Sequence, residues 1–578
     1  MKSKQFPKFI IVTGGVMSGV GKGIATASIG LILKNYGFNV SAVKIDPYIN
    51  FDAGTLRPTE HGEVWVTDDG GEIDQDLGNY ERFLSQHFNR KNNITTGQIY
   101  AKVIENERKG KFLGQTVQLI PHISNEIKSR IKESGKGFDF VMVEIGGTIG
   151  DYENIPYLFA IKSMERELGE NNVKYVLITY LPTPRHIGEM KTKPTQQAIK
   201  MLSENGIFPD FILCRAKDPV DRVRKKKIEI YANIDSDHVI SAPDIETLYS
   251  VPMNFERDNL GEKILKEFNL KRKKKPNWTV WKKSVNIIKN PPKRIDIAMV
   301  GKYLDTGDFT LKDSYISVAQ AVEHAGVKNK CGVNIHWISA QDVESGKIKD
   351  RELKKYKGFI VPGGFGKEGV EGKIRTIKFA RENKVPFLGL CFGLQLAVVE
   401  YARNVCGMKD ANSIEINPDT DYPVINIIKS QESIIKHSRY GGSMRLGAYG
   451  AILDGESVVY KLYKTTKRLK EDKEQIEFLK NDKENAFRLG ICEENKPMVL
   501  ERHRHRYEVN NDFVNSISKS GLKFPGYHNL TTEEKLMEYI ELSSHPFFIG
   551  TQAHPEFKSS LISPSPLFYG FIREALKK

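Results

Sequence analysis

Short apolar, β-branched runs alternate with helix-length segments along most of the chain. In the first half these runs are 9–15, 40–46, 138–147, 173–182 and 210–216. A second series follows at 294–303, 358–364, 386–391 and 545–552. Strands that are buried on both faces of a parallel sheet read as continuous apolar runs, and crossover helices connect them. The pattern therefore predicts an α/β chain with two doubly wound domains in series.

A basic, proline-containing stretch at 271–293 separates the two series. It begins with the run 271–275, in which every residue is Lys or Arg, and it includes the pair Pro291-Pro292. This composition is typical of a linker between domains. We therefore expect one domain at 1–270 and another at 294–578. Residues 464–487 are so rich in charge that we expect a surface insertion without chemistry there.

The bulk composition indicates a globular protein of a reducing compartment. No stretch approaches the roughly 18–20 uninterrupted apolar residues that a membrane span requires. The apolar run near the N-terminus breaks after four residues at Thr13, which favours a strand over a signal peptide. The five cysteines are far apart, without a CxxC pair or a Cys/His cluster, so neither a disulfide framework nor structural zinc is indicated. We expect a cytoplasmic protein that makes no membrane contact.

The formal net charge of +15 indicates anionic partners. Nucleic acid is one such partner, and small polyanions such as nucleotides are the other. The basic stretch 501–507 has the sequence ERHRHRY and is a candidate RNA-binding patch. Aromatic side chains on which bases could stack are almost absent around it, which disfavours RNA.

The sequence GLCFG at 389–393 has the spacing of a nucleophile elbow, in which a strand turns sharply into a helix. Cys391 would then lie at a helix N-terminus, which favours the thiolate. A buried core cysteine is the alternative interpretation. Two further strand ends favour chemistry: His554 with Glu556 forms a base and its orienting acid, and 361–366 (VPGGFG) offers backbone N–H groups to an oxyanion together with Phe392.

A glycine-rich loop follows the first predicted strand and leads into a helix. The sequence TGGVMSGVGKG at 13–23 combines glycines, a lysine and a helix N-terminus, which together form a phosphate cradle. The spacing from Gly15 to Gly21-Lys22 is one residue longer than usual, and Gly23 replaces the Ser or Thr that commonly binds Mg²⁺. Carboxylates must then carry the metal, and Asp76 and Glu144 are the candidates.

The motifs VPGG, GxCxGxQ and HPE occur in the order typical of class I glutamine amidotransferases, which the second half of the chain resembles. The resemblance implies that Cys391 is the nucleophile that forms a glutamyl thioester. It also implies that His554 is the general base and acid, with Glu556 as its partner. The residues that it places on glutamine are Gly364, Phe392, Gln395, Glu415 and Arg506.

Three further stretches, 44–50 (KIDPYIN), 146–153 (GGTIGDYE) and 191–196 (KTKPTQ), together with SGVGKG, closely resemble the CTP synthases over practically the whole chain. The resemblance implies a P-loop, Rossmann-like synthase domain followed by a class I amidotransferase domain. It implies a carbon–nitrogen ligase in which ATP phosphorylates O4 of UTP and ammonia channelled from glutamine displaces the phosphate. Members of this family use Mg²⁺, are activated by GTP and inhibited by CTP, form homotetramers and can form filaments.

The same resemblance assigns the nucleotide sites residue by residue. It places ATP on Gly19, Val20, Gly21, Lys22, Gly23, Ile24 and Asp76, and Mg²⁺ on Asp76 and Glu144. It places UTP or CTP on Ser18, Asp151, Tyr152, Glu153, Lys191, Thr192, Lys193, Pro194, Thr195, Gln196 and Lys227.

Two alternatives stay open at this point. An amide synthase of the cobyrinic acid type would also join a phosphate-loop domain to an amidotransferase, although 44–50 and 191–196 argue against it. A nucleotide-regulated scaffold or RNA-binding protein would explain the charge, but it would leave Cys391, His554 and Glu556 without a purpose.

Overall fold

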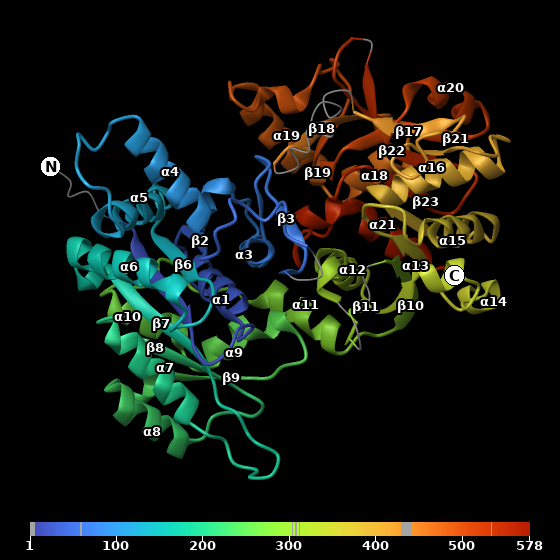
Figure 1. Cartoon of the computed structure of the whole chain (residues 1–578). Helices are drawn as coiled ribbons and strands as arrows, with labels where there is room; N and C mark the ends of the chain where they lie inside the picture. The colour runs from blue at the N-terminus through green and yellow to red at the C-terminus, as the bar shows by residue number, and fades with distance from the viewer. Residues whose placement is uncertain are drawn as a thin grey trace. The chain divides into compact units, whose positions relative to one another are not determined.

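The computed structural model describes residues 6–57, 61–302, 305–306, 309–310, 312–428, 442–532 and 534–578. The chain divides into two compact units. The first comprises Met1–Ala53 and Asp74–Val285, and the second comprises Gly54–Ile73 and Asn286–Lys578. In Figure 1 the first unit runs from blue to green and the second from green to red, apart from a blue segment around β3.

The first unit is built on a wholly parallel sheet with the strand order β5-β2-β6-β1-β7-β8-β9. The central strands are buried along almost their full length, which is why they read as continuous apolar runs. The bounds of the strands are β1 Lys8–Gly14, β2 Val40–Asp46, β5 Asn93–Thr95, β6 Phe140–Ile145, β7 Val173–Tyr180, β8 Phe211–Ala216 and β9 Val239–Pro243. The sequence did not indicate β5 or β9.

Helices cover both faces of this sheet. On one face α1 packs with α3, α9 and α10, and on the other α4 to α8 share a core with the strands. Their bounds are α1 Lys22–Asn35, α3 Asp76–Leu84, α4 Thr96–Arg108, α5 Ser124–Ser134, α6 Ile155–Leu168, α7 Lys193–Glu204, α8 Arg222–Ala232, α9 Val251–Arg257 and α10 Leu260–Glu267. The expected linker contains α11 (Thr279–Lys289), and the boundary between the units falls within this helix.

The second unit contains a mixed sheet with the strand order β13-β10-β14-β15-β23-β22-β21-β18-β19. The part from β13 to β23 is parallel, as the sequence predicted, and the remainder is an antiparallel extension. The bounds are β10 Arg294–Gly301, β13 Gly332–Ser339, β14 Phe359–Val361, β15 Phe387–Leu390, β18 Arg445–Leu453, β19 Met498–His505, β21 Leu522–Asn529, β22 Lys535–Leu542 and β23 Phe548–Thr551. Small sheets add β11 Asp305–Thr306, β12 Phe309–Thr310, β16 Asn412–Ser413, β17 Pro423–Ile427 and β20 Tyr507–Val509.

Two hydrophobic cores lie on opposite faces of this sheet. Phe359, Val361 and Phe387 belong to one core, whereas Ile360 and Leu388 belong to the other, as the alternation of side chains along a strand requires. The helices are α12 Ile316–Lys328, α13 Ala340–Glu344, α14 Asp350–Leu353, α15 Val370–Glu382, α16 Phe392–Asn404, α18 Val458–Thr465, α19 Arg468–Lys480, α20 Asn511–Lys519 and α21 Pro566–Ala575. No helix in the described part of the chain is long and apolar enough to cross a membrane.

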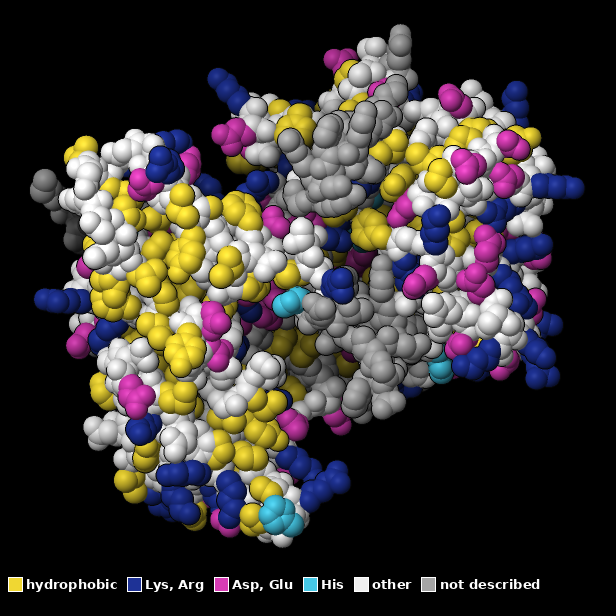
Figure 2. All heavy atoms as spheres, in the orientation of Figure 1, with side chains coloured by type: hydrophobic (Ala, Val, Ile, Leu, Met, Phe, Trp, Pro, Cys, Tyr) yellow, Lys and Arg dark blue, Asp and Glu magenta, His cyan; other side chains and the backbone are white. Residues whose placement is uncertain are grey.

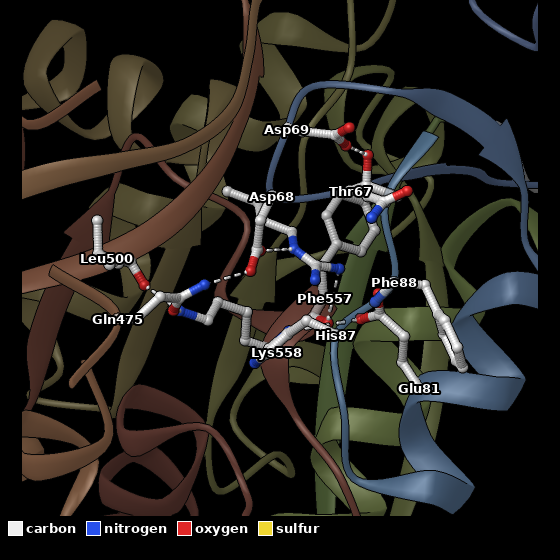
Figure 3. A network of polar contacts seen from close by, with 12 residues as sticks. Thr67, Asp68, Asp69, Glu81, His87, Phe88, Gln475, Leu500, Phe557 and Lys558 are labelled. Atoms are coloured by element: carbon white, nitrogen blue, oxygen red, sulfur yellow. Dashed lines mark hydrogen bonds and ion pairs between the residues drawn. The ribbon is translucent and has the colours of Figure 1, made fainter. Parts of the chain in front are cut away.

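The segment 54–73, which the sequence placed in the domain 1–270, groups with the second unit because its side chains are bound there. Its hairpin of β3 (Val64–Val66) and β4 (Glu72–Asp74) lies beside β19 (Figure 1). Asp68 accepts from Arg502 Nε at 2.5 Å and from Gln475 Nε2 at 2.6 Å (Figure 3). The contacts of this hairpin are therefore with residues more than 400 positions away in the chain.

The charged stretch 464–487 lies largely at the surface, as expected, but it is not wholly solvated. Its helix α19 buries Arg468, Asp472 and Ile476, which lie one turn apart on one face. Asp472 accepts from the backbone N–H of Leu500 at 3.1 Å and pairs with Lys558 at 3.3 Å. A count of charges alone does not reveal which of them a buried partner neutralises.

Candidate active site

Cys391 alone makes the turn between β15 and α16. Its backbone has φ 51° and ψ −104°, a conformation that L-residues with a side chain rarely adopt. A Cβ at Gly393 would lie 2.0 Å from the carbonyl oxygen of Val361, so only glycine fits there. The segment therefore has the strand–turn–helix geometry of a nucleophile elbow.

His554 and Glu556 follow β23, the strand that pairs with β15. His554 Nδ1 lies 2.7 Å from Glu556 Oε1, and the imidazole stacks on the ring of Phe557. Cys391 lies within hydrogen-bonding reach of this imidazole. Although burial favours the neutral ring, Glu556 and Cys391 raise the pKa of His554 to about 10. The three side chains thus form a nucleophile, a base and an orienting acid.

A cavity of about 500 Å³ opens onto these residues. Five of the residues predicted for this site line it: Gly364, Cys391, Arg506, His554 and Glu556. The other three predicted residues, Phe392, Gln395 and Glu415, lie outside its lining. Gln395 Nε2 donates to the carbonyl oxygen of Tyr507 at 2.9 Å, and Glu415 Oε1 accepts from the backbone N–H of Gly366 at 2.9 Å.

No role in this site was predicted for the segment 54–73, yet it supplies part of the cavity wall through Gly54, Thr55, Leu56, Arg57, Glu63 and Val64. Glu72 accepts from Arg504 Nε at 2.8 Å, and the ring of Trp65 lies 4.9 Å from that of Phe557. Acidic residues of this segment thus meet the basic stretch 501–507. That complementarity of charge is the one signal in the sequence that could have paired the two segments.

The candidate RNA-binding patch 501–507 is an internal part of the second unit. Arg502 and His503 are at most 1% exposed, and Arg502 and Arg504 pair with carboxylates of the segment 54–73. Their charges are therefore neutralised within the protein, and this stretch does not present a basic surface to a nucleic acid.

In the first unit, the glycine-rich loop joins β1 to α1. Gly19 and Gly21 have φ 69° and 95°, which favours glycine. Lys22 Nζ donates to the carbonyl oxygen of Gly147 at 2.6 Å, and burial lowers the pKa of Lys22. A Cβ at Gly23 would lie 2.1 Å from Asp76 Oδ1. The unusual glycine at this position is thus explained, since the Asp76 carboxylate occupies the space that a Ser or Thr side chain would need.

Lys44, on β2, lies among four carboxylates. Its Nζ lies 3.3 Å from Glu144 Oε1, 3.7 Å from Asp46 Oδ1 and 4.0 Å from Asp74 Oδ1, and it contacts Asp76 Oδ2. Burial lowers the pKa of Lys44, but Asp76 and Glu144 outweigh it and hold that pKa well above its ordinary value. The ammonium thus stands between the two carboxylates that the sequence proposed for Mg²⁺. The stretch 44–50 was recognised as a motif, but no role was predicted for Lys44.

The residues predicted for the pyrimidine nucleotide lie in this loop and in three further segments of the first unit. Ser18 is exposed within the loop itself. The loop 147–153, where Asp151 Oδ2 accepts from the backbone N–H of Thr148 at 2.6 Å, packs through Gly150 against Met201 of α7.

At the start of α7, Lys193 is exposed and Pro194 is partly buried. Gln196 Nε2 lies 3.4 Å from Thr192 Oγ1, and Lys191 pairs with Glu189 at 2.9 Å. The side chain of Thr195 turns into the core, where it lies 3.0 Å from Thr179 Oγ1. Lys227 is exposed on α8, which packs against α7.

A second cavity, of about 280 Å³, lies beside the phosphate loop in the first unit. Gly21 and Ile24 line it, together with Leu213, Phe255, Arg215 and Asp244. Leu213 and Arg215 lie on β8, Asp244 follows β9 and Phe255 lies on α9, and no role was predicted for any of them. Isolated residues at strand ends carry no motif, so the sequence offers no signal for them.

Comparisons with known proteins agree with this arrangement. Residues 8–270 match the family model described as CTP synthase N-terminus, and residues 310–574 match the one for class I glutamine amidotransferases. The CTP synthase of Pyrococcus abyssi is 47% identical over 568 residues, which cover 98% of each chain. That of Methanocaldococcus jannaschii is 46% identical over 574 residues, again 98% of each chain.

A solved structure, the glutaminase domain of the Trypanosoma brucei CTP synthase with bound acivicin, is also similar to part of this chain. It is 32% identical, and the match covers 49% of this chain and 94% of that chain with a TM-score of 0.40. The family models and the full-length relatives together decide the assignment: the chain belongs to the CTP synthase family.

Proposed function

We propose that the protein converts UTP to CTP, with ATP as the phosphoryl donor and glutamine as the nitrogen source. The observation that carries the proposal is the presence in one chain of a Cys391, His554 and Glu556 constellation and a phosphate loop with Lys22. The first would release ammonia, and the second would activate the uracil ring by phosphorylation. Similarity over 98% of the chain to CTP synthases supports this pairing over an amide synthase of the cobyrinic acid type.

In the glutaminase half-reaction, the Cys391 sulfur attacks the side-chain amide of glutamine, and His554 takes the thiol proton and passes it to the departing ammonia. Water then releases glutamate from the thioester. The backbone N–H groups of Gly364 and Phe392 face the developing oxyanion. Glu415 and Arg506 carry the charges that pair with the α-ammonium and α-carboxylate of an amino acid.

In the synthase half-reaction, phosphorylation turns O4 of UTP into a good leaving group, which ammonia then displaces. Lys22 stabilises the charge on the transferring phosphoryl group. The apolar cavity beside Gly21 and Ile24 suits the adenine ring, with Arg215 and Asp244 at its edge. Ammonia passes from one half-reaction to the other as the neutral molecule, because ammonium has no lone pair with which to attack.

Mg²⁺ would be held by Asp76 and Glu144. Among the described residues, no group of three or more His, Cys, Asp or Glu forms a complete cage for a metal. A pair of carboxylates nevertheless fits this ion, which commonly takes one or two carboxylates and completes its shell with phosphate and water. The contact of both carboxylates with the Lys44 ammonium supports a cationic position between them. When bound, the metal would neutralise phosphate charge.

We further propose that CTP inhibits the enzyme through the loop that contains Asp151, Tyr152 and Glu153. UTP and CTP share a ribose triphosphate, which the basic cradle of Lys191, Lys193 and Lys227 can hold for both. Acidic side chains repel phosphate. They can instead accept hydrogen bonds from neutral donors such as ribose hydroxyls or an exocyclic amine. GTP activation and filament formation are proposed from the family alone.

Glu153→Lys is expected to weaken CTP inhibition by about tenfold or more, which is what one lost charge-assisted hydrogen bond can do. The apparent KM for UTP should change much less. Steady-state inhibition measurements at several CTP concentrations check this, with Glu170→Lys as a control on another exposed turn. A parallel change for both nucleotides would show that Glu153 serves the shared part of the site, and no change for either would remove it from the site.

Self-association, with a homotetramer as the expected state, is supported by the surface of the first unit. Leu113, Leu119, Tyr152, Ile155 and Phe159 are between 43% and 91% exposed, and Figure 2 shows apolar side chains gathered over the region of α4 to α6. Contiguous apolar surface of this kind is rare on monomers and marks interaction sites. The five free cysteines suit a reducing compartment such as the cytoplasm.

Ile155→Asp is expected to weaken assembly by about a hundredfold or more, because burying an unpaired carboxylate costs several kcal/mol. Light scattering after size-exclusion chromatography, over a dilution series, measures the change. Phe478→Asp, at a side chain of α19 that is 70% exposed, is the control. If Ile155→Asp leaves the mass unaltered at every concentration, this surface is not the contact.

The direct test of the proposed function is incubation with UTP, ATP, Mg²⁺ and glutamine, followed by chromatography of the nucleotides. CTP and glutamate should form together in equal amounts. Release of glutamate from glutamine without CTP would contradict the proposal, and so would a failure to form CTP when ammonium salts replace glutamine.

A further inference from the structure

Lys373, in the first turns of α15, is an unusual lysine because its side chain is completely buried. Its exposed fraction is 0%, and its Nζ has no hydrogen-bond partner among the residues that the structure describes. Lysine is almost never fully buried unless it is paired. This burial could not be predicted from the sequence, since a lysine on an amphipathic helix usually faces water.

The amine lies over the residue that follows the nucleophile. Lys373 Nζ is 5.4 Å from the centroid of the Phe392 ring, a distance at which a cation is attracted to an aromatic face. Phe392 is the first residue of α16 and donates one of the two N–H groups proposed for the oxyanion. Lys373 therefore contacts a residue of the proposed glutaminase site, Phe392, without itself lining the cavity.

Few charges act on this amine. Lys302, after β10, opposes its protonation, and Cys391 favours it. Lys302 Nζ donates to the carbonyl oxygen of Gly366 at 3.3 Å, and Glu415, which accepts from the N–H of the same glycine, partly balances Lys302. Burial, followed by Lys302, lowers the pKa of Lys373 to about 7. The amine is thus mostly neutral above that pH until a negative charge forms nearby.

A buried amine without a partner destabilises a fold, and a methionine of similar length would fill the same space without that penalty. Groups that destabilise the fold and make no stabilising contact in exchange are characteristic of functional sites. The place of Lys373 beside Phe392 indicates which function it serves.

We propose that Lys373 is a positioning residue of the glutaminase site that holds the Phe392 ring at the start of α16 and, as an ammonium, stabilises the Cys391 thiolate. The inference rests on the proposed role of Cys391 as the nucleophile. The thiol proton still goes to His554, and Lys373 acts through its charge without transferring a proton. Because a thiolate favours the ammonium, the ammonium favours the thiolate by the same free energy.

The test compares Lys373→Met with Lys378→Met, a control on the same helix whose Nζ contacts Asn404 at the surface. The rate at which iodoacetamide alkylates Cys391 is measured against pH in the whole enzyme, together with kcat and KM for glutamine, the rate with ammonium salts, and Tm. In Lys373→Met the pH profile of alkylation should move to higher pH, because a nearby cation that favours the thiolate has been removed. For the same reason kcat with glutamine should fall by about tenfold near pH 7.

Three further results are expected from the same experiment. The deficit should shrink at alkaline pH, because Lys373 is then neutral in the wild type as well. The KM for glutamine and the rate with ammonium salts should stay near wild type, since Lys373 contacts neither glutamine nor the synthase site. The Tm should be unchanged or higher, because a buried unpaired amine has been removed. Lys378→Met should leave every measurement unchanged.

An unshifted alkylation profile with wild-type kcat would overturn the inference, and so would equal losses with glutamine and with ammonium salts. If Lys373→Met does not fold, Lys373→Gln takes its place, and failure of both variants to fold would assign the amine to the core instead. Failure of the proposed function can be told apart from failure of this inference by the behaviour of the wild-type enzyme. If Cys391 is not the nucleophile, it would resist alkylation, or its alkylation would leave glutamine hydrolysis intact.

Discussion

Replacing Cys391 by alanine is expected to lower glutamine-supported CTP formation by about 10³-fold or more, as for loss of a catalytic nucleophile. With ammonium salts at mildly alkaline pH, most of the wild-type rate should remain, because neutral ammonia then comes from solution. Alanine keeps the Cβ and therefore the backbone strain at φ 51°, so the elbow itself is preserved. Only the sulfur that we propose as the nucleophile is lost.

Chromatography of CTP and measurement of released glutamate, each with both nitrogen sources, check this expectation. Cys492→Ala, which removes an exposed cysteine, is the matched control and should behave as the wild type. Equal loss with glutamine and with ammonium salts would refute the role of Cys391, because a residue of the glutaminase site alone cannot affect chemistry that uses supplied ammonia.

The geometry around Cys391 could be predicted because it depends on neighbours in the sequence. A strand that turns into a helix at one residue requires glycine where the backbone approaches another strand, as Gly393 approaches Val361. The spacing of His554 and Glu556 is likewise local, and their contact at 2.7 Å follows from the turn after β23. Motifs of this kind record backbone geometry directly in residue types.

The contributions of Lys44 and of the segment 54–73 could not be predicted, because they depend on tertiary proximity. The role of Lys44 is visible only in the folded structure, where its ammonium pairs with Asp76 and Glu144. The same holds for Glu72, whose partner Arg504 lies far along the chain. In α19 a local signal did exist, since Arg468, Asp472 and Ile476 share one face. Their charged neighbours obscured it.

Gly23 shows how a departure from a motif becomes informative once the structure is known. From the sequence alone, the missing Ser or Thr weakened the case for a phosphate loop. In the fold, the Asp76 carboxylate fills the space where that side chain would be. The loop therefore has no room for that side chain, and Asp76 is the residue that we propose as a metal ligand in its place.

Lys22→Ala is expected to lower CTP formation by about 10²–10³-fold with either nitrogen source, a typical effect of removing one preorganised group that stabilises transition-state charge. Lys22 is 8% exposed, and its Nζ is held on the carbonyl oxygen of Gly147 at 2.6 Å, so it is already positioned beside the phosphate loop. Both nitrogen sources are affected because ammonia, whatever its origin, attacks only the phosphorylated uracil. The initial rates of CTP formation with glutamine and with ammonium salts measure the loss.

Two controls separate loss of chemistry from loss of structure in this variant. Lys34→Ala changes a lysine in the last turn of the same helix, away from the loop, and should retain the wild-type rate. Alkylation of Cys391 in Lys22→Ala should proceed as in the wild type, because the second unit is unaltered. If the rate with ammonium salts stays near wild type, the glycine-rich loop is a structural turn, and phosphoryl transfer must be assigned to other residues.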